Sequence, residues 1–250
     1  AGFSSIELSF NLTPTMVNTA QRLSKQGLVK IISIHNYCPI PDGLSRKKAL
    51  PDCFSMASCD EGQRSLAVRY TKKTIDTASR LSAKAVVLHC GRVEIPDYTR
   101  KLIRLSLKLP ETKKKLSEAK SAFFAQRAAH IKAHLSNTLK SLNEIAHYAQ
   151  RQNICLGFET RFYYREIPAF EEIGVILDEF RGSNIFYWHD TGHAHIMESL
   201  GLTHKKSFLD RYHKKMLGIH LHDVKDGRDH LAPTFGAVDF KYIKKYIKAD

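Results

Sequence analysis

Short apolar, β-branched segments alternate along the sequence with longer segments whose apolar residues recur at helical spacing. The apolar segments are typical of strands that are buried on both faces, as in parallel sheets. We predict six strands, at residues 3–8, 29–35, 85–90, 154–159, 185–190 and 217–222. This regular alternation of strands and helices predicts a parallel sheet with right-handed crossovers.

Capping residues, prolines and glycines mark the predicted helix boundaries. Thr13-Pro14 predicts the start of the first helix, which Gly27 ends. Ser58 and Glu61 have the spacing of a capping box before the second helix. Residues 111–152 predict one or two long helices, another helix begins at Pro168 and ends near Gly182, and Asp239 is expected to cap a last helix through Tyr246.

Two architectures share this alternation: an open doubly wound sheet and a (βα)8 barrel. Neither G-x-G-x-x-G nor G-x-x-x-x-G-K-[ST] follows a predicted strand, which disfavours a nucleotide-binding sheet, and no G-x-S-x-G elbow is present. The barrel is favoured because successive predicted strands end in ionisable residues, and the carboxyl ends of barrel strands face one mouth. These residues are His35, His89, Glu159, Asp190 and His220, with His193, Asp229 and His230 in adjoining loops.

Five strand ends that each carry His, Asp or Glu are hard to explain as structural residues. Burying so many ionisable groups together is costly unless a cation compensates them. Imidazole and carboxylate together suit Zn²⁺, Mn²⁺ or Fe²⁺ better than Ca²⁺ or Mg²⁺. We therefore predict a divalent metal site at the mouth of the barrel.

The spacing of the last of these residues refines the prediction. Gly192 permits a sharp turn, so that Asp190 and His193 can both reach the mouth. His220 and His222 share one face of a strand. His220 is deeper in the strand and is favoured as a metal ligand, whereas His222 is expected to be either a ligand or a neighbour of one.

Length and composition are those of a globular domain. The chain has 250 residues, 43% hydrophobic and 26% charged. No apolar run approaches the roughly 18 residues of a membrane-spanning helix, and the start lacks the pattern of a signal peptide. The five cysteines are odd in number and form no C-x-x-C, so we expect reduced thiols, no disulfide framework, a cytoplasmic location and no membrane partner.

The net charge of +14 suggests an anionic substrate or partner. Much of the excess lies on residues 100–151, where a solvated helical face is the simplest interpretation. A smaller basic set follows the predicted strands at the ligand-bearing end and is able to bind the phosphate of a small sugar or of a DNA backbone. The candidate substrate-binding residues are Arg92, Arg161, His222, Lys225 and Arg228.

The predicted strand ends also form a familiar series of short motifs. They are FSSIEL at 3–8, IHNYCP at 34–39, LH at 88–89, GFE at 157–159, WHDTGH at 188–193, and HLHD at 220–223 with Asp229-His230. In this order they resemble the xylose isomerase-like TIM-barrel superfamily, which includes sugar isomerases and epimerases and the endonuclease IV type of DNA-repair enzyme. The resemblance covers nearly the whole chain.

The resemblance implies an α/β fold with a single (βα)8 TIM-barrel domain over residues 1–250. About six βα units are visible, because residues 2–8 resemble the second strand of the family. No residue corresponds to the metal-binding glutamate that the family carries on its eighth strand. We therefore expect the first and eighth strands to be missing from this sequence.

The resemblance also implies a ligand set for one to three zinc or manganese ions. Glu159, Asp190 and His220 match the central metal site of the superfamily. His35 and His89 match positions that hold a further metal in the endonuclease IV branch. The third site of that branch is matched by His193, Asp229 and His230, although the loop reads Asp-His in place of Asp-x-His.

Three functions remain open at this point. The favoured hypothesis is a metal-dependent isomerase or epimerase of a sugar or sugar phosphate, acting through an enediolate, with Glu159 and His193 as candidate catalytic residues. The alternative is a multi-zinc phosphodiesterase acting on abasic DNA, for which the full histidine set and the positive charge are arguments. A basic binding module without catalysis is the third. Segments 161–170 and 220–240 resemble the isomerase branch and favour the isomerase or epimerase hypothesis.

Overall fold

A six-stranded parallel sheet in chain order forms the centre of the computed structural model, which describes residues 2–247. All six predicted strands are present, each hydrogen-bonded in parallel to the next along the chain. The last one ends at His220, so the prediction that His222 lies on the same strand is wrong. The strands are β1 (Ser5–Leu8), β2 (Lys30–His35), β3 (Ala85–Leu88), β4 (Cys155–Glu159), β5 (Ile185–Asp190) and β6 (Met216–His220).

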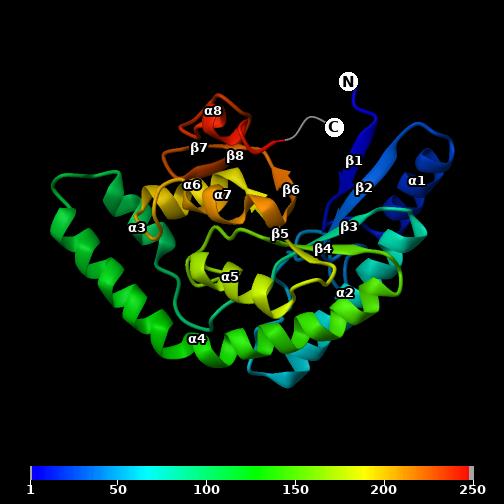
Figure 1. Cartoon of the computed structure of the whole chain (residues 1–250), viewed down its shortest axis with the longest axis horizontal. Coiled ribbons are helices and arrows are strands. Elements are labelled where there is room, and N and C mark those ends of the chain that lie inside the picture. The colour runs from blue at the N-terminus through cyan, green and yellow to red at the C-terminus, as the bar shows by residue number, and fades with distance from the viewer. Residues whose placement is uncertain (1, 248–250) are drawn as a thin grey trace.

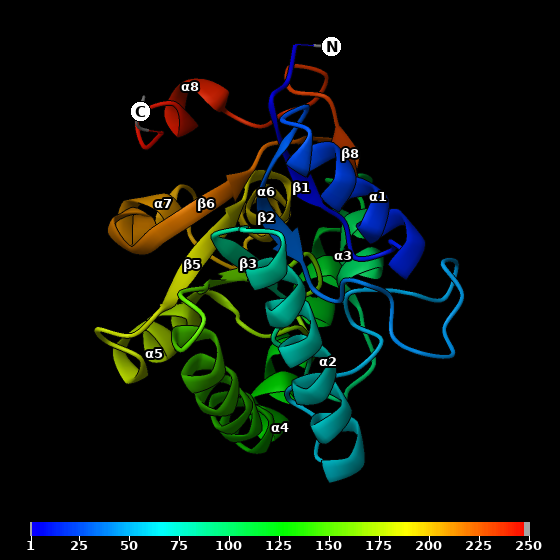
Figure 2. The ribbon, with the colours of Figure 1, turned by 90° about the vertical axis from the view of Figure 1, so that its right-hand side faces the viewer.

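The helices surround the outside of this sheet, and the long α4 runs along one margin of the molecule (Figures 1 and 2). The region predicted as one or two long helices is a single helix, α4 (Lys113–Gln150). The others are α1 (Pro14–Lys25), α2 (Glu61–Arg80), α3 (Thr99–Ser106), α5 (Phe170–Glu179), α6 (Thr191–Ser199), α7 (Ser207–Tyr212) and α8 (Phe240–Ile243).

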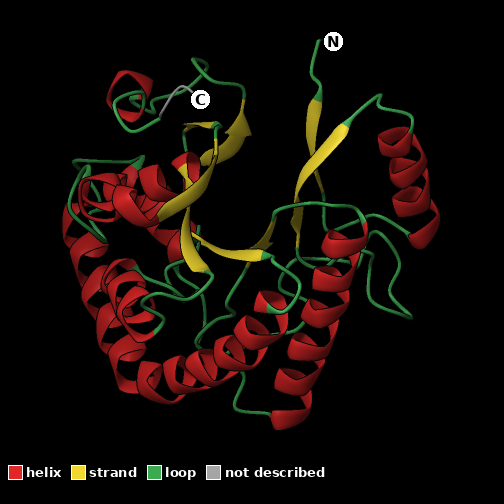
Figure 3. Ribbon diagram, turned by 45° about the vertical axis from the view of Figure 1, so that its right-hand side comes forward, coloured by secondary structure: helices red, strands yellow, loops and turns green. Residues whose placement is uncertain are grey.

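The sheet is curled, with its helices on the convex side and β1 and β6 at its two edges (Figure 3). A doubly wound sheet carries helices on both faces, so that alternative is wrong. The architecture is that of a TIM barrel, and the six strands described here form part of a barrel wall. The curl turns the carboxyl ends of all six strands toward one mouth.

Three local predictions differ from the structure. The second helix is capped by Asp60, whose side chain accepts from the Gln63 amide, so the capping box at Ser58 is wrong. Asp239 does cap α8, but this helix ends at Ile243 and not at Tyr246. The sequence analysis also missed α3, α6, α7 and an antiparallel hairpin, β7 (Asp223–Lys225) and β8 (Arg228–Leu231), which lies beside the mouth.

The two faces of the sheet pack differently. The convex face contributes Val86, Leu156 and Phe158 to a large core beneath the helices. The concave face contributes a small cluster of Ala85, Val87 and Trp188. This cluster lies below the mouth, so the ionisable strand ends stand above an apolar floor.

All five cysteines are unpaired thiols. Cys38 and Cys90 are buried, and burial raises the pKa of each thiol to about 12. Within residues 2–247 the structure contains no helix that combines the length and the apolar character needed to cross a bilayer.

Trp188 occupies the concave face because the neighbouring strands carry glycine beside it. A Cβ on Gly157 would lie 2.8 Å from Trp188 Cε3, and one on Gly218 would lie closer still to the outer atoms of the indole. We expect Gly218→Ala to destabilise the protein by about 1–3 kcal/mol through overpacking. Thermal and urea unfolding measure the loss.

The matched control for this prediction is the double variant Gly218→Ala/Trp188→Phe. Phenylalanine lacks the outer indole atoms. The loss of stability in the double variant should therefore be smaller than the sum of the losses in the two single variants. Strict additivity of the two effects would show that the contact does not set the packing of the concave face.

Candidate metal centre and active-site cavity

The strand register brings the predicted residues together. Asp190 on β5 pairs with His220 on β6, and Glu159 on β4 pairs with Trp188 on β5. His35 ends β2, and His89 directly follows β3. Glu159 and Asp190 are 2% and 1% exposed, so both carboxylates need close compensating partners.

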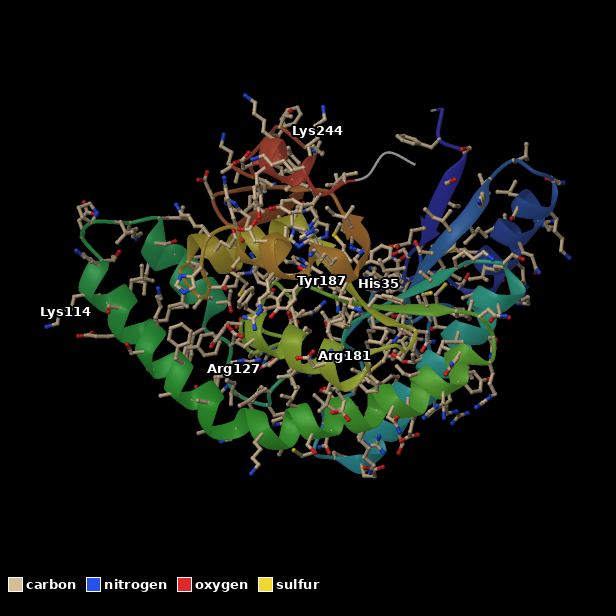
Figure 4. The ribbon with its side chains drawn as sticks, in the orientation of Figure 1. His35, Lys114, Arg127, Arg181, Tyr187 and Lys244 are labelled. Atoms are coloured by element: carbon tan, nitrogen blue, oxygen red, sulfur yellow. The ribbon has the colours of Figure 1, made fainter. Side chains whose placement is uncertain are left out.

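Glu159 is at the centre of this group. Its Oε2 lies 2.7 Å from His89 Nε2, 3.6 Å from His35 Nε2 and 3.4 Å from Arg161 Nη1. Its Oε1 contacts His220 Nδ1. Burial opposes ionisation of this carboxyl, but hydrogen bonds from the surrounding imidazoles outweigh it and hold the pKa well below its usual range. The central ligand set predicted from the sequence is thus one continuous cluster, near the middle of the molecule where His35 lies in Figure 4.

In their neutral forms, two of the histidines would present lone pairs to this carboxylate. His35 Nδ1 lies 3.0 Å from the Asn36 carbonyl oxygen, which fixes the proton of the neutral ring on Nδ1. His89 Nδ1 is held in the same way, 2.8 Å from Asp52 Oδ2. In a neutral ring each Nε2 would face Glu159 as an acceptor facing an acceptor, whereas a charged ring donates to it. Either a second proton on the ring or a cation removes that repulsion.

His220 connects the two edges of the sheet. Its Nδ1 contacts Glu159, and its Nε2 lies 3.1 Å from Oε1 of Glu7 on β1. The other oxygen of Glu7, Oε2, accepts from the Ser33 hydroxyl at 2.7 Å. Burial disfavours the charged imidazole, but the hydrogen bonds to Glu159 and Glu7 outweigh it and raise the pKa of His220 to about 11. Glu7 is a carboxylate of the site that sequence reasoning missed.

A second group extends from Asp190 toward the hairpin. His222 Nε2 lies 2.9 Å from the Asp190 carboxylate, while its Nδ1 accepts from the His230 amide at 3.0 Å. His193 donates from Nδ1 to the Thr160 carbonyl at 2.8 Å and directs Nε2 toward Asp229, 3.9 Å away. The Nε2 proton makes His222 a supporting neighbour of Asp190, whereas His193 presents a lone pair to the cavity.

The donor set fits a divalent cation. In each of three groups, one ligand atom per residue lies within 4.8 Å of the others: His35, His89 and Glu159; Glu159, Asp190 and His193; His193, His222 and His230. Facing lone pairs of imidazole and carboxylate, buried together, are the arrangement that a metal ion satisfies. Glu159 belongs to two of the groups and is the natural shared ligand.

A cavity of about 670 Å³ opens above this cluster. Of the predicted substrate-binding residues, Arg161 and His222 line it, whereas Arg92, Lys225 and Arg228 are not among its lining residues. Arg161 is engaged by carboxylates: Nη2 lies 2.9 Å from Asp52 Oδ2 and 3.0 Å from Glu166 Oε1. None of the basic residues of α4 is among its lining residues, and Lys114 lies at the outer end of that helix (Figure 4).

Sequence reasoning missed several residues of this cavity, among them Glu7, Asp52 and Arg100. Glu7 stands within the quoted FSSIEL motif, and its place at the end of the first strand was a usable signal. Asp52 and Arg100 line the cavity from a loop and from α3, and neither stands at a strand end. No sequence pattern marks them, because their partners are distant in the chain.

A curled α/β barrel whose strand ends gather histidines and carboxylates around a cavity defines the class of the protein. The chain belongs to the xylose isomerase-like TIM-barrel family, whose sequence model matches residues 1–250. Comparison with the curated proteins finds no match.

Solved structures with this fold include several sugar epimerases. A D-tagatose 3-epimerase-like protein has a TM-score of 0.63 at 20% identity, over 98% of this chain and 78% of that protein. A 3-keto-D-glucoside 4-epimerase from E. coli has a TM-score of 0.66 at 12% identity, over 98% and 77%. An L-ribulose 3-epimerase has a TM-score of 0.63 at 18% identity, over 98% and 67%. At these identities the likeness establishes the fold.

The hydrogen-bond partners predict opposite tautomers for two neighbouring histidines. In chelator-treated protein at mildly alkaline pH we expect His193 to carry its proton on Nδ1 and His222 on Nε2. Long-range ¹⁵N–¹H NMR of the imidazole nitrogens distinguishes the two forms, with His193→Gln and His222→Gln assigning the signals. The same tautomer at both positions would contradict the hydrogen-bond network.

Proposed function

We propose that this protein is a divalent-metal-dependent isomerase or epimerase of a sugar or sugar phosphate. The observation that carries the proposal is the buried Glu159 carboxylate, contacted by imidazoles and placed beneath a cavity of about 670 Å³. The family and the sugar epimerases that share the fold support it.

Glu159, Asp190 and His220 are the residues that would hold the central metal ion, with His35 and His89 available to a second. A bound divalent ion supplies a Lewis acid that polarises a carbonyl and an adjacent hydroxyl of an open-chain sugar. The protein supplies anionic oxygen and imidazole nitrogen ligands that the strand ends place in advance.

The side chains of the cluster provide the proton transfers. Glu159 is held ionised, so its carboxylate is ready to accept the proton from the carbon beside the substrate carbonyl. The electron pair of that C–H bond forms the carbon–carbon double bond of the enediolate. His193, whose Nδ1 proton is held by the Thr160 carbonyl, presents the lone pair of Nε2, which takes a proton from solvent and delivers it to the enediolate, while Glu159 returns its proton to solvent. Return to the neighbouring carbon gives isomerisation, and return to the opposite face of the same carbon gives epimerisation.

The phosphodiesterase alternative is favoured by one observation. His35 and His89 lie against Oε2 of Glu159 and offer a second ion a place that a single-metal isomerase does not require. Metal analysis of the purified protein together with an abasic-DNA cleavage assay tests it. Two or three zinc ions and cleavage would replace our proposal, whereas one ion and no cleavage would support it.

The proposed role of Glu159 leads to a direct prediction. Glu159→Gln keeps the shape of the side chain but removes the base and the ligand charge, so we expect kcat on a responsive sugar to fall by at least roughly 100-fold. Circular dichroism should show an intact fold. Glu198→Gln, a partly buried carboxylate outside the cavity, is the matched control and should keep wild-type activity. Full activity of Glu159→Gln would refute its role.

Asp52 is expected to tune the affinity for the ion through His89. Its carboxylate accepts from His89 Nδ1 at 2.8 Å and thereby holds Nε2 toward Glu159. Losing such an outer carboxylate typically weakens metal binding by about 10- to 100-fold, and we expect this for Zn²⁺ bound at the Glu159 cluster in Asp52→Asn. Calorimetric titration with Zn²⁺ measures it.

Asp42→Asn is the control for this measurement. Asp42 belongs to the same loop but is exposed and bonds Lys73 at 2.7 Å, so its loss should leave the affinity unchanged. Unaltered Zn²⁺ binding in Asp52→Asn would show that Asp52 has only a packing role.

A further inference from the structure

One cation at the active-site cavity is left without a carboxylate partner. Arg100 on α3 lines the cavity together with the candidate ligands. No carboxylate oxygen of residues 2–247 lies within the 4.0 Å of an ion pair with its guanidinium. Arg161 on the same wall, in contrast, contacts Asp52, Glu159 and Glu166.

The structure holds Arg100 in place by neutral contacts. Its guanidinium carbon lies 4.5 Å from the centre of the Phe162 ring. Its Nη1 donates to the Gly227 carbonyl at 3.3 Å, and its Nη2 donates to the Tyr163 hydroxyl at 3.4 Å. Two long bonds to neutral acceptors use only part of the five-donor fork of an arginine. The side chain is oriented while most of its hydrogen-bonding capacity stays available.

The hairpin turn that meets Arg100 is itself fixed. Gly227 has a φ of +74°, and a Cβ at this position would collide with the Ile103 side chain on the helix that carries Arg100. The turn therefore packs directly against α3. Helix, turn and the Phe162–Tyr163 segment together place one guanidinium at the cavity wall.

The rest of the cavity lining differs from Arg100 in charge. Apart from Arg100 and Arg161, its charged lining consists of acidic side chains and histidines: Glu7, His35, Asp52, His89, Glu159, Glu166, Asp190, His193, His220, His222, Asp229 and His230. Such a surface suits a cation and the hydroxyls of a polyol, and it repels a free anion. Arg100 is therefore the cation of this cavity that is left, among the residues described, to pair with an anionic group on the substrate.

We propose that Arg100 binds an oxyanion carried by the substrate, a phosphate or a carboxylate, so that the enzyme acts on an acidic sugar in preference to a neutral one. Planar guanidinium groups bind such oxyanions through two parallel hydrogen bonds. This inference rests on the proposed sugar isomerase function and narrows its substrate class.

Calorimetric titrations of metal-loaded protein at constant ionic strength test the proposal. The probes are D-fructose, D-fructose 6-phosphate and D-glucuronate. Wild type should bind at least one of the two acidic sugars more tightly than fructose. Arg100→Gln should lose roughly 10- to 100-fold in affinity for that acidic sugar, the usual worth of charge-assisted hydrogen bonds, and should bind fructose as wild type does.

Lys101→Gln is the matched control. Lys101 is the next residue on α3, is exposed and is not among the lining residues, so its loss should change none of the affinities. If Arg100→Gln does not fold, Arg100→Lys keeps the charge without the fork and should show a smaller loss for the acidic sugar.

The outcomes separate this inference from the function on which it rests. If wild type and Arg100→Gln bind fructose and both acidic sugars equally well, the role of Arg100 is overturned while the sugar isomerase proposal stands. If none of the three sugars binds to wild type, both proposals are contradicted. Selectivity for the phosphate alone or the carboxylate alone supports the inference and identifies the oxyanion.

Discussion

The arrangement of this site depends on how the negative charge of one buried carboxylate, that of Glu159, is compensated. Glu159 is 2% exposed, and an ionised carboxyl at that depth is stable only with cationic or donating neighbours. Arg161 provides a permanent charge 3.4 Å away, and His89 and His220 provide imidazole nitrogens. These contacts join β4 to the loop after β3 and to β6. The charge balance of Glu159 therefore connects the packing of the barrel wall to its chemistry.

Two further carboxylates contact the imidazoles that surround Glu159. Asp52 lies behind His89 and Glu7 lies behind His220, so two imidazoles each stand between an outer and an inner carboxylate. Such partners fix the tautomer of a ligand and raise its basicity. His222 supports Asp190 in a related way, as a donor to the carboxylate. The side chains of the cluster are thus oriented by contacts within the chain itself.

The strands, and the gathering of histidines and carboxylates at their carboxyl ends, were predictable from the sequence, because parallel strands leave continuous apolar runs and their ends share one mouth. The supporting residues were not. Glu7 and His220 are 213 positions apart, and Asp52 and His89 are 37 apart, so only the curl of the sheet and the path of a loop bring them together. Arg100 escaped notice because α3 lies in a basic stretch that otherwise reads as a solvated face, and its neutral partners leave no charge pattern.

The central claim is that Glu159 and its neighbours take a proton from carbon. The most direct measurement is solvent isotope exchange: metal-loaded protein is incubated in D₂O with a panel of ketoses and their phosphates, and deuterium on carbon is followed by NMR. We predict incorporation at a carbon beside the carbonyl of the substrate, and none with Glu159→Gln. Interconversion of a sugar without deuterium uptake, or equal uptake with Glu159→Gln, would contradict the account.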